Sequence, residues 1–226
     1  MRVLAIILAL VTSSAAVHAG AWHPPAAYAY TPIARCAEPA SANLKPNEAR
    51  YEICTDQMAL FDAALAKART SNKLLIVDFG ATWCPWCRSL QAQWQSPTLL
   101  GHKGGTIDFA TSFDIVEVGI STIHAGRRLD VPSGHAVLNE VLAQTPATKL
   151  RSVPFLAVID PNDRSKTVTR NLDDFESANA GRHDASFIRA FLTEAHDHIR
   201  NRATAPSPPG WLRAKFNRAW MKLFGV

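Results

Sequence analysis

LLIVDFGATWCPWCR, residues 74–88, is an apolar run that ends in two cysteines separated by two residues. The consecutive apolar residues at its start predict a strand that is buried on both faces. Pro85 suits the first turn of a helix, because that turn needs no backbone donor. The stretch therefore predicts a strand, a tight loop and a helix that begins beside Cys84.

The two cysteines are placed for thiol–disulfide chemistry. The unpaired N–H groups and the dipole of a helix N-terminus favour a thiolate, so Cys84 is predicted to be the attacking sulfur. Cys87 follows one helical turn later and can resolve a mixed disulfide by forming an intramolecular bond. Asp78 is the lone acid of the apolar strand. A buried, unpaired carboxylate has a raised pKa, which lets it exchange protons near neutral pH.

This stretch resembles the thioredoxin superfamily in the pattern VDF-x-A-x-WC-x-x-C, which is met by Val77, Asp78, Phe79, Ala81, Trp83, Cys84 and Cys87. A second match is Ser152-Val153-Pro154-Phe155, where Pro154 stands in the place of the family's cis-proline. The resemblance implies that Asp78 helps to move the proton of the resolving thiol. Two departures leave substrate range and redox potential open: Gly80 replaces a common tryptophan, and Pro-Trp replaces Gly-Pro between the cysteines.

Other uses of a CxxC pair are weaker interpretations. A zinc site needs two further ligands, and Cys36 and Cys54 are separated by seventeen residues rather than arranged as a second knuckle. Attachment of a c-type haem needs a histidine after the second cysteine, where Arg88 stands. A purely structural disulfide stays open. No metal, nucleotide or flavin site is evident, so we expect no cofactor.

The N-terminus has the features of a secretory signal peptide. Arg2 precedes an apolar stretch, and small residues follow up to Ala19. We therefore expect residues 1–19 to direct export, most simply to a bacterial periplasm, although an uncleaved anchor stays open. In an oxidising compartment Cys36 and Cys54 would pair and tether an irregular arm, residues 20–54. Two free thiols or a second redox pair are the alternatives.

The basic residues are concentrated at the C-terminus. The chain of 226 residues has 24 Lys and Arg against 19 Asp and Glu, and a hydrophobic content of 47%, ordinary for one globular domain with extensions. Residues 200–226 contain six bases and no acid, so residues 20–199 are nearly neutral, with 17 bases and 19 acids.

The end of the chain predicts a separate amphipathic helix. Prolines and a glycine between residues 206 and 210 mark a linker within 201–226, and Trp211 to Phe224 form a basic, aromatic-rich helical pattern. Such a helix suits peripheral contact with an anionic membrane. Packing against the domain stays open as the alternative. Export argues against a nucleic-acid partner.

The remaining periodicity predicts an α/β fold. We expect helices from Thr55 to about Ala68, from Cys84 to before Pro97, from Ser133 to before Pro146, and from Asp184 or Ser186 to Ile199, with strands at 74–79, 114–120, 155–159 and 166–170. A central mixed sheet with helices on both faces accommodates this order. This is also the arrangement of the thioredoxin-like fold. The resemblance covers residues 55–200.

We therefore interpret the chain as an exported thiol–disulfide oxidoreductase that reduces or exchanges disulfides in client proteins. Cys84, Cys87 and Asp78 would carry the chemistry, and a redox partner protein would supply electrons. The resemblance implies a docking surface made by Trp83, Pro85, Trp86, Val153 and Pro154. The alternative is a binding or assembly module with the same fold and a static disulfide.

Overall fold

The computed structural model describes residues 30–37, 48–95, 99, 107–172 and 185–200. The predicted signal peptide, residues 1–19, and the predicted amphipathic helix within 201–226 lie outside these residues. Among the helices of the described ranges, none is both long and apolar enough to cross a membrane.

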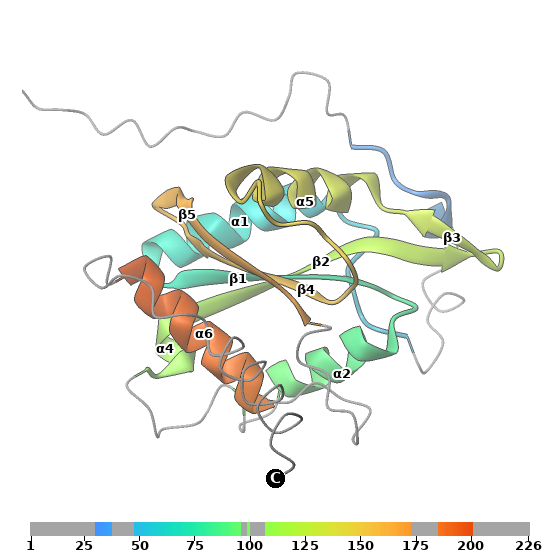
Figure 1. Ribbon diagram of the computed structural model, residues 1–226. Coiled ribbons are helices and arrows are strands. Elements are labelled where there is room, and N and C mark those ends of the chain that lie inside the picture. The colour runs from blue at the N-terminus through green and yellow to red at the C-terminus, as the bar shows by residue number, and fades with distance from the viewer. Residues whose placement is uncertain (1–29, 38–47, 96–98, 100–106, 173–184, 201–226) are drawn as a thin grey trace, which may run out of the picture.

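A five-stranded mixed sheet with the strand order β3-β2-β1-β4-β5 forms the centre of the molecule (Figure 1). The strands are β1 Leu74–Ala81, β2 Phe113–His124, β3 Arg127–Asp130, β4 Phe155–Asp160 and β5 Asp163–Asn171. β1 pairs with β2 in parallel and with β4 antiparallel, and all eight of its residues are buried. The apolar run 74–79 is therefore the central strand, covered on both faces as predicted.

Helices cover both faces of this sheet (Figure 1). They are α1 Gln57–Thr70, α2 Pro85–Trp94, α4 Phe109–Ser112, α5 Pro132–Gln144 and α6 Ala185–Arg200, with a short 3-10 turn η1 at Ala34–Ala37. Alternate residues of β1 separate two cores. Leu75, Val77 and Phe79 pack with α1 and α5, whereas Leu74 and Ile76 pack with α2 and α6. The thioredoxin-like fold is confirmed.

The sequence misplaced several element ends. α1 begins at Gln57 rather than beside Thr55, because Asp56 is its N-cap and accepts a hydrogen bond from the Met58 N–H. α5 begins at Pro132 and has no side-chain cap, so Ser133 lies inside the first turn. Phe187 of α6 is 42% exposed, although its neighbour Ile188 is fully buried.

The sequence also missed a β-hairpin at one edge of the sheet. β2 continues to His124, beyond the predicted end at Ile120, and pairs there with β3. β3 has only four residues and a mostly exposed, charged sequence, RRLD, so it lacks the apolar alternation by which a strand is identified.

A disulfide between Cys36 and Cys54 holds the N-terminal segment against the domain, with 5.4 Å between the two Cα atoms. Arg35, beside Cys36, is 4% exposed. Its guanidinium pairs with Glu48 at 2.7 Å and donates to the Thr122 hydroxyl and the Ile123 carbonyl. A buried guanidinium is tolerated only when it is paired in this way. The described part of the segment is therefore built into the fold and is more than a tethered arm.

Candidate functional site

Cys84 and Cys87 lie at the start of α2, where Cys84 is the N-cap and Pro85 the first helical residue. The Cys87 N–H donates to the Cys84 sulfur at 3.0 Å, and the two cysteines form a disulfide. Cys84 is 3% exposed and Cys87 fully buried. A donor aimed at Cys84 and a helix dipole behind it both favour negative charge on that sulfur in the reduced chain.

The loop before β4 faces Cys84. The peptide bond between Val153 and Pro154 is cis, and the Val153 carbonyl oxygen lies 3.5 Å from the Cys84 sulfur. Trp83, Trp86 and Val153 are partly buried against the cluster that contains both cysteines. The structure thus gathers the predicted docking residues around the disulfide, and Pro85 is exposed at its rim.

Asp78 is fully buried in β1, and its carboxylate has partners that the sequence did not predict. It accepts hydrogen bonds from Trp94 Nε1 at 2.8 Å and from the Tyr51 hydroxyl at 3.3 Å. Burial raises the pKa of Asp78 to about 7, and the nearby charge of Glu117 raises it further against the lowering effect of both donors. The expectation of an unpaired carboxylate was wrong, whereas the raised pKa agrees with it.

The two donors to Asp78, Trp94 and Tyr51, lie on the helix that carries Cys87 and in the buried cluster of the cysteines, respectively. Trp94 follows Cys87 by seven residues on α2, so the two side chains share the face that packs on the sheet. Tyr51 belongs to the same buried cluster as Cys84 and Cys87. Burial and the neighbouring Asp78 charge raise the pKa of Tyr51 well above its usual value, so its hydroxyl stays a donor.

Two glycines make room for Tyr51. Gly80 of β1 and Gly119 of β2 are register partners. A Cβ atom at Gly80 would lie 1.9 Å from the Tyr51 hydroxyl, and one at Gly119 would lie 2.6 Å from a methyl group of Ile53. The N-terminal segment therefore fills the space beside β1 that a larger residue at position 80 would occupy. Gly80 was the sequence signal for this contact, but nothing local identified Tyr51 as the partner.

Gly80→Ala should lower the free energy of unfolding by about 1–3 kcal/mol, because the new methyl group overlaps the Tyr51 ring. In a Tyr51→Ala background the same change should cost almost nothing, as denaturant titration of the four proteins of the cycle would show. Gly126→Ala is the matched control: its cost arises from a positive φ of 76° in open space and should be equal in both backgrounds. Equal costs for Gly80→Ala would contradict the contact.

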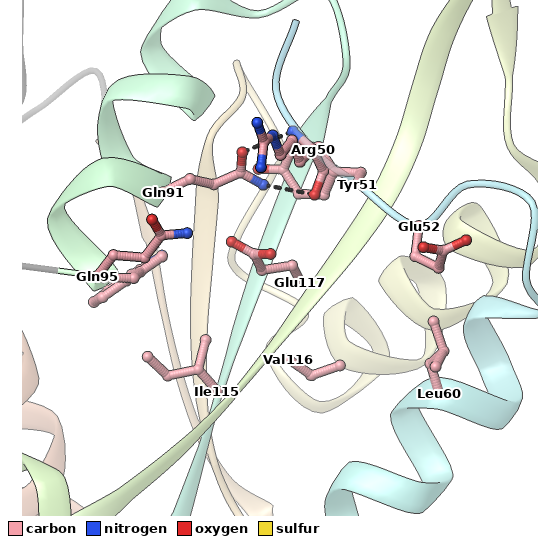
Figure 2. A pocket seen from close by; sticks show the side chains of 10 residues that line it. Arg50, Tyr51, Glu52, Leu60, Gln91, Gln95, Ile115, Val116 and Glu117 are labelled. Atoms are coloured by element: carbon pink, nitrogen blue, oxygen red, sulfur yellow. Dashed lines mark hydrogen bonds between the residues drawn. The ribbon is translucent and has the colours of Figure 1, made fainter. Parts of the chain in front are cut away.

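A second carboxyl lies beside Asp78. Glu117 is the register partner of Asp78 on β2 and lines an open pocket of about 670 Å³ (Figure 2). Gln91 crosses this pocket and is fixed by the Arg50 backbone, with N–H to Oε1 at 2.8 Å and Nε2 to the carbonyl at 3.1 Å. Partial burial raises the pKa of Glu117. The sequence did not predict either side chain as part of the site.

The described residues contain no group of three or more His, Cys, Asp or Glu side chains that could hold a metal ion.

Comparison with known proteins gives a family match for part of the chain. The family model described as Thioredoxin matches residues 52–110. A thioredoxin H-type from Chlamydomonas reinhardtii is 37% identical over 57 residues, which are 25% of this chain and 49% of that protein. The chain thus spans about half the length of this curated relative. The crystal structure of a disulphide isomerase from Xylella fastidiosa Temecula1 aligns over 54% of this chain and 76% of its own, with 18% identity and a TM-score of 0.38.

Proposed function

Because this chain is a member of the thioredoxin superfamily, we propose that it is a thiol–disulfide oxidoreductase that reduces or exchanges disulfides in client proteins. The observation that carries the proposal is the position of Cys84. It is the N-cap of α2, receives the Cys87 N–H, and faces the Val153 carbonyl beside the cis peptide bond.

The reaction begins with the reduced chain. The Cys84 thiolate attacks one sulfur of a client disulfide, so a bond forms between Cys84 and the client while the client's S–S bond breaks. The second client sulfur leaves as a thiolate and takes a proton from water. Of the two cysteines only Cys84 has any exposed surface, which fits the attacking role.

Resolution uses the buried cysteine. The Cys87 thiol loses its proton, which Asp78 accepts, and the Cys87 sulfur attacks Cys84. The first client sulfur leaves as a thiolate, and the chain ends with the Cys84–Cys87 disulfide. Two electrons from a redox partner protein restore the dithiol. A carboxyl with a pKa of about 7 can accept this proton and release it again at neutral pH.

A trapping experiment tests the proposal. In Cys87→Ser the attack by Cys84 can occur but resolution cannot, so the variant should accumulate a mixed disulfide with a model disulfide protein, seen as a reducible adduct in mass spectrometry. The double variant Cys84→Ser/Cys87→Ser is the matched control and should form none. If Cys87→Ser forms no adduct, the chain is a module with a static disulfide.

Export remains part of the proposal. It is supported by the sequence of residues 1–19 and by the Cys36–Cys54 disulfide, since Cys54 is exposed and a reducing cytosol would open such a bond. The mass of the mature protein should correspond to cleavage after Ala19.

We also propose that the basic pattern from Trp211 to Phe224 contacts anionic lipid. Removal of residues 210–226 should then abolish sedimentation of the chain with anionic vesicles.

A further inference from the structure

The β2–β3 hairpin holds an arginine against the tryptophan that precedes the attacking cysteine. The guanidinium carbon of Arg128 lies 3.8 Å from the centroid of the Trp83 ring. The indole Nε1 of Trp83 donates to the Ser121 hydroxyl at 3.2 Å, and that hydroxyl donates to the Leu129 carbonyl at 3.3 Å. Trp83 is therefore fixed by both strands of the hairpin, and Arg128 is held by a cation–π contact.

The charge of Arg128 is available to a partner. β3 is an edge strand of the sheet, and both Arg127 and Arg128 are exposed. Within the part of the chain that the structure describes, neither arginine forms an ion pair with an acid. Asp130, the acid of the same strand, lies 3.6 Å from His135 of α5 instead. A stacked guanidinium keeps its N–H groups at the ring edge, where they can bind a carboxylate in a bidentate manner.

Two further arginines lie near Cys84 or near the loop that faces it. Arg88 lies on the first turn of α2, and its backbone N–H donates to the Cys84 carbonyl at 3.3 Å. Arg151 stands two residues before Val153, whose carbonyl faces the Cys84 sulfur. Both Arg88 and Arg151 are exposed. Exposed basic residues therefore stand one helical turn after Cys84, two residues before Val153, and on β3 at Arg128.

We propose that Arg128 is a specificity-determining residue, and that the clients of this chain carry an Asp or Glu close to the cysteine that Cys84 attacks. The inference rests on the proposed function and names its substrate class. Trp83 is bonded directly to Cys84, so a carboxylate on Arg128 would belong to a residue within about three positions of the client cysteine, given about 3.3 Å per extended residue. The ligand is an extended acidic segment of a disulfide-containing protein.

Two synthetic disulfide peptides test this proposal. They are identical except that Glu in one and Lys in the other stands two residues before the cysteine. Each is mixed with the pre-reduced full chain, and the second-order rate constant is divided by that of the same peptide with 2-mercaptoethanol, which corrects for the peptide's own reactivity. We expect the Glu peptide to be favoured about fivefold at low salt and less at 0.5 M salt.

Variants of Arg128 decide the cause. Arg128→Gln should bring the ratio near one, Arg128→Glu should invert it, and Arg128→Lys should retain most of it. Arg200→Gln is the matched control, since Arg200 donates to the Asn72 carbonyl at the opposite end of β1, and it should leave the ratio unchanged. A ratio near one in the unmodified chain, or one that Arg128→Gln and Arg128→Glu do not alter, overturns the proposal while the reductase activity stands. Failure to reduce either peptide overturns both.

Discussion

Replacing Cys84 with serine should lower the rate at which the chain reduces a model disulfide by at least about 10³-fold. A hydroxyl is not ionised near neutral pH and cannot form the mixed disulfide, so no alternative route through Cys87 exists: Cys87 is fully buried and cannot reach a client. The measurement is the single-turnover oxidation of the pre-reduced chain, followed by acid quenching and thiol counting.

The second cysteine pair provides the control for that experiment. Cys36→Ser/Cys54→Ser removes the other disulfide, which joins residues 18 positions apart, so the free energy of unfolding should fall by about 3 kcal/mol. Below its unfolding temperature this variant should still react within about tenfold of the unmodified rate, because Cys84 and Cys87 remain. If Cys84→Ser were as active as the unmodified chain, the mechanism would be wrong. Complete loss of activity in Cys36→Ser/Cys54→Ser would mean that the second pair, rather than Cys84 and Cys87, carries the chemistry.

Much of the fold follows from local sequence. The run from Leu74 to Phe79 has no polar residue except Asp78, which suits only a central strand, and Pro85 after Cys84 determines where α2 begins. The amphipathic pattern of α6 likewise gives its buried face. These features depend on the order of neighbouring residues, so they can be predicted without knowing what packs against them.

The partners of Asp78 and Cys84 could not be predicted in the same way. Tyr51 reaches Asp78 from a segment 27 residues earlier in the chain, and Glu117 is placed beside Asp78 by the pairing of β1 with β2. Arg128 reaches Trp83 through a hairpin too short and polar to show as a strand. The candidate reacting groups could thus be predicted from the sequence, whereas the neighbours that affect their charge depend on tertiary contacts.

Asp78→Asn should slow resolution by Cys87 about 10²-fold near pH 7–8. In the unmodified chain the resolution rate should rise through about pH 7 as the Asp78 carboxylate forms, because that is its pKa. Asn cannot accept the proton, so the resolution rate of the variant should rise only at the higher pH where the Cys87 thiol ionises by itself. Glu117→Gln is the control: it keeps the base but removes a neighbouring charge, which should move the midpoint to lower pH. An unchanged profile in Asp78→Asn would rule out proton transfer.

Stability gives an independent readout of the same group. The pKa of Asp78 is about 7 in the folded chain against 3.8 for an exposed carboxyl, so the folded state holds a proton that the unfolded state has lost between these values. Its contribution to stability is present below about pH 4 and is lost as pH rises through 7, by up to about 4 kcal/mol. Asp78→Asn should therefore become progressively more stable than the unmodified chain across this window.

Asp78→Ala should behave differently from Asp78→Asn, although both remove the charge. The Asn side chain can accept from Trp94 Nε1 through its oxygen and donate to the Tyr51 hydroxyl through its nitrogen, so both buried polar groups keep a partner. Ala leaves the indole N–H and the hydroxyl without one, and each such group costs about 1–3 kcal/mol. Denaturant titration at pH 8 should therefore rank Asn above Ala by a few kcal/mol. Equal stability of the two variants would mean that water, rather than Asp78, satisfies Trp94 and Tyr51.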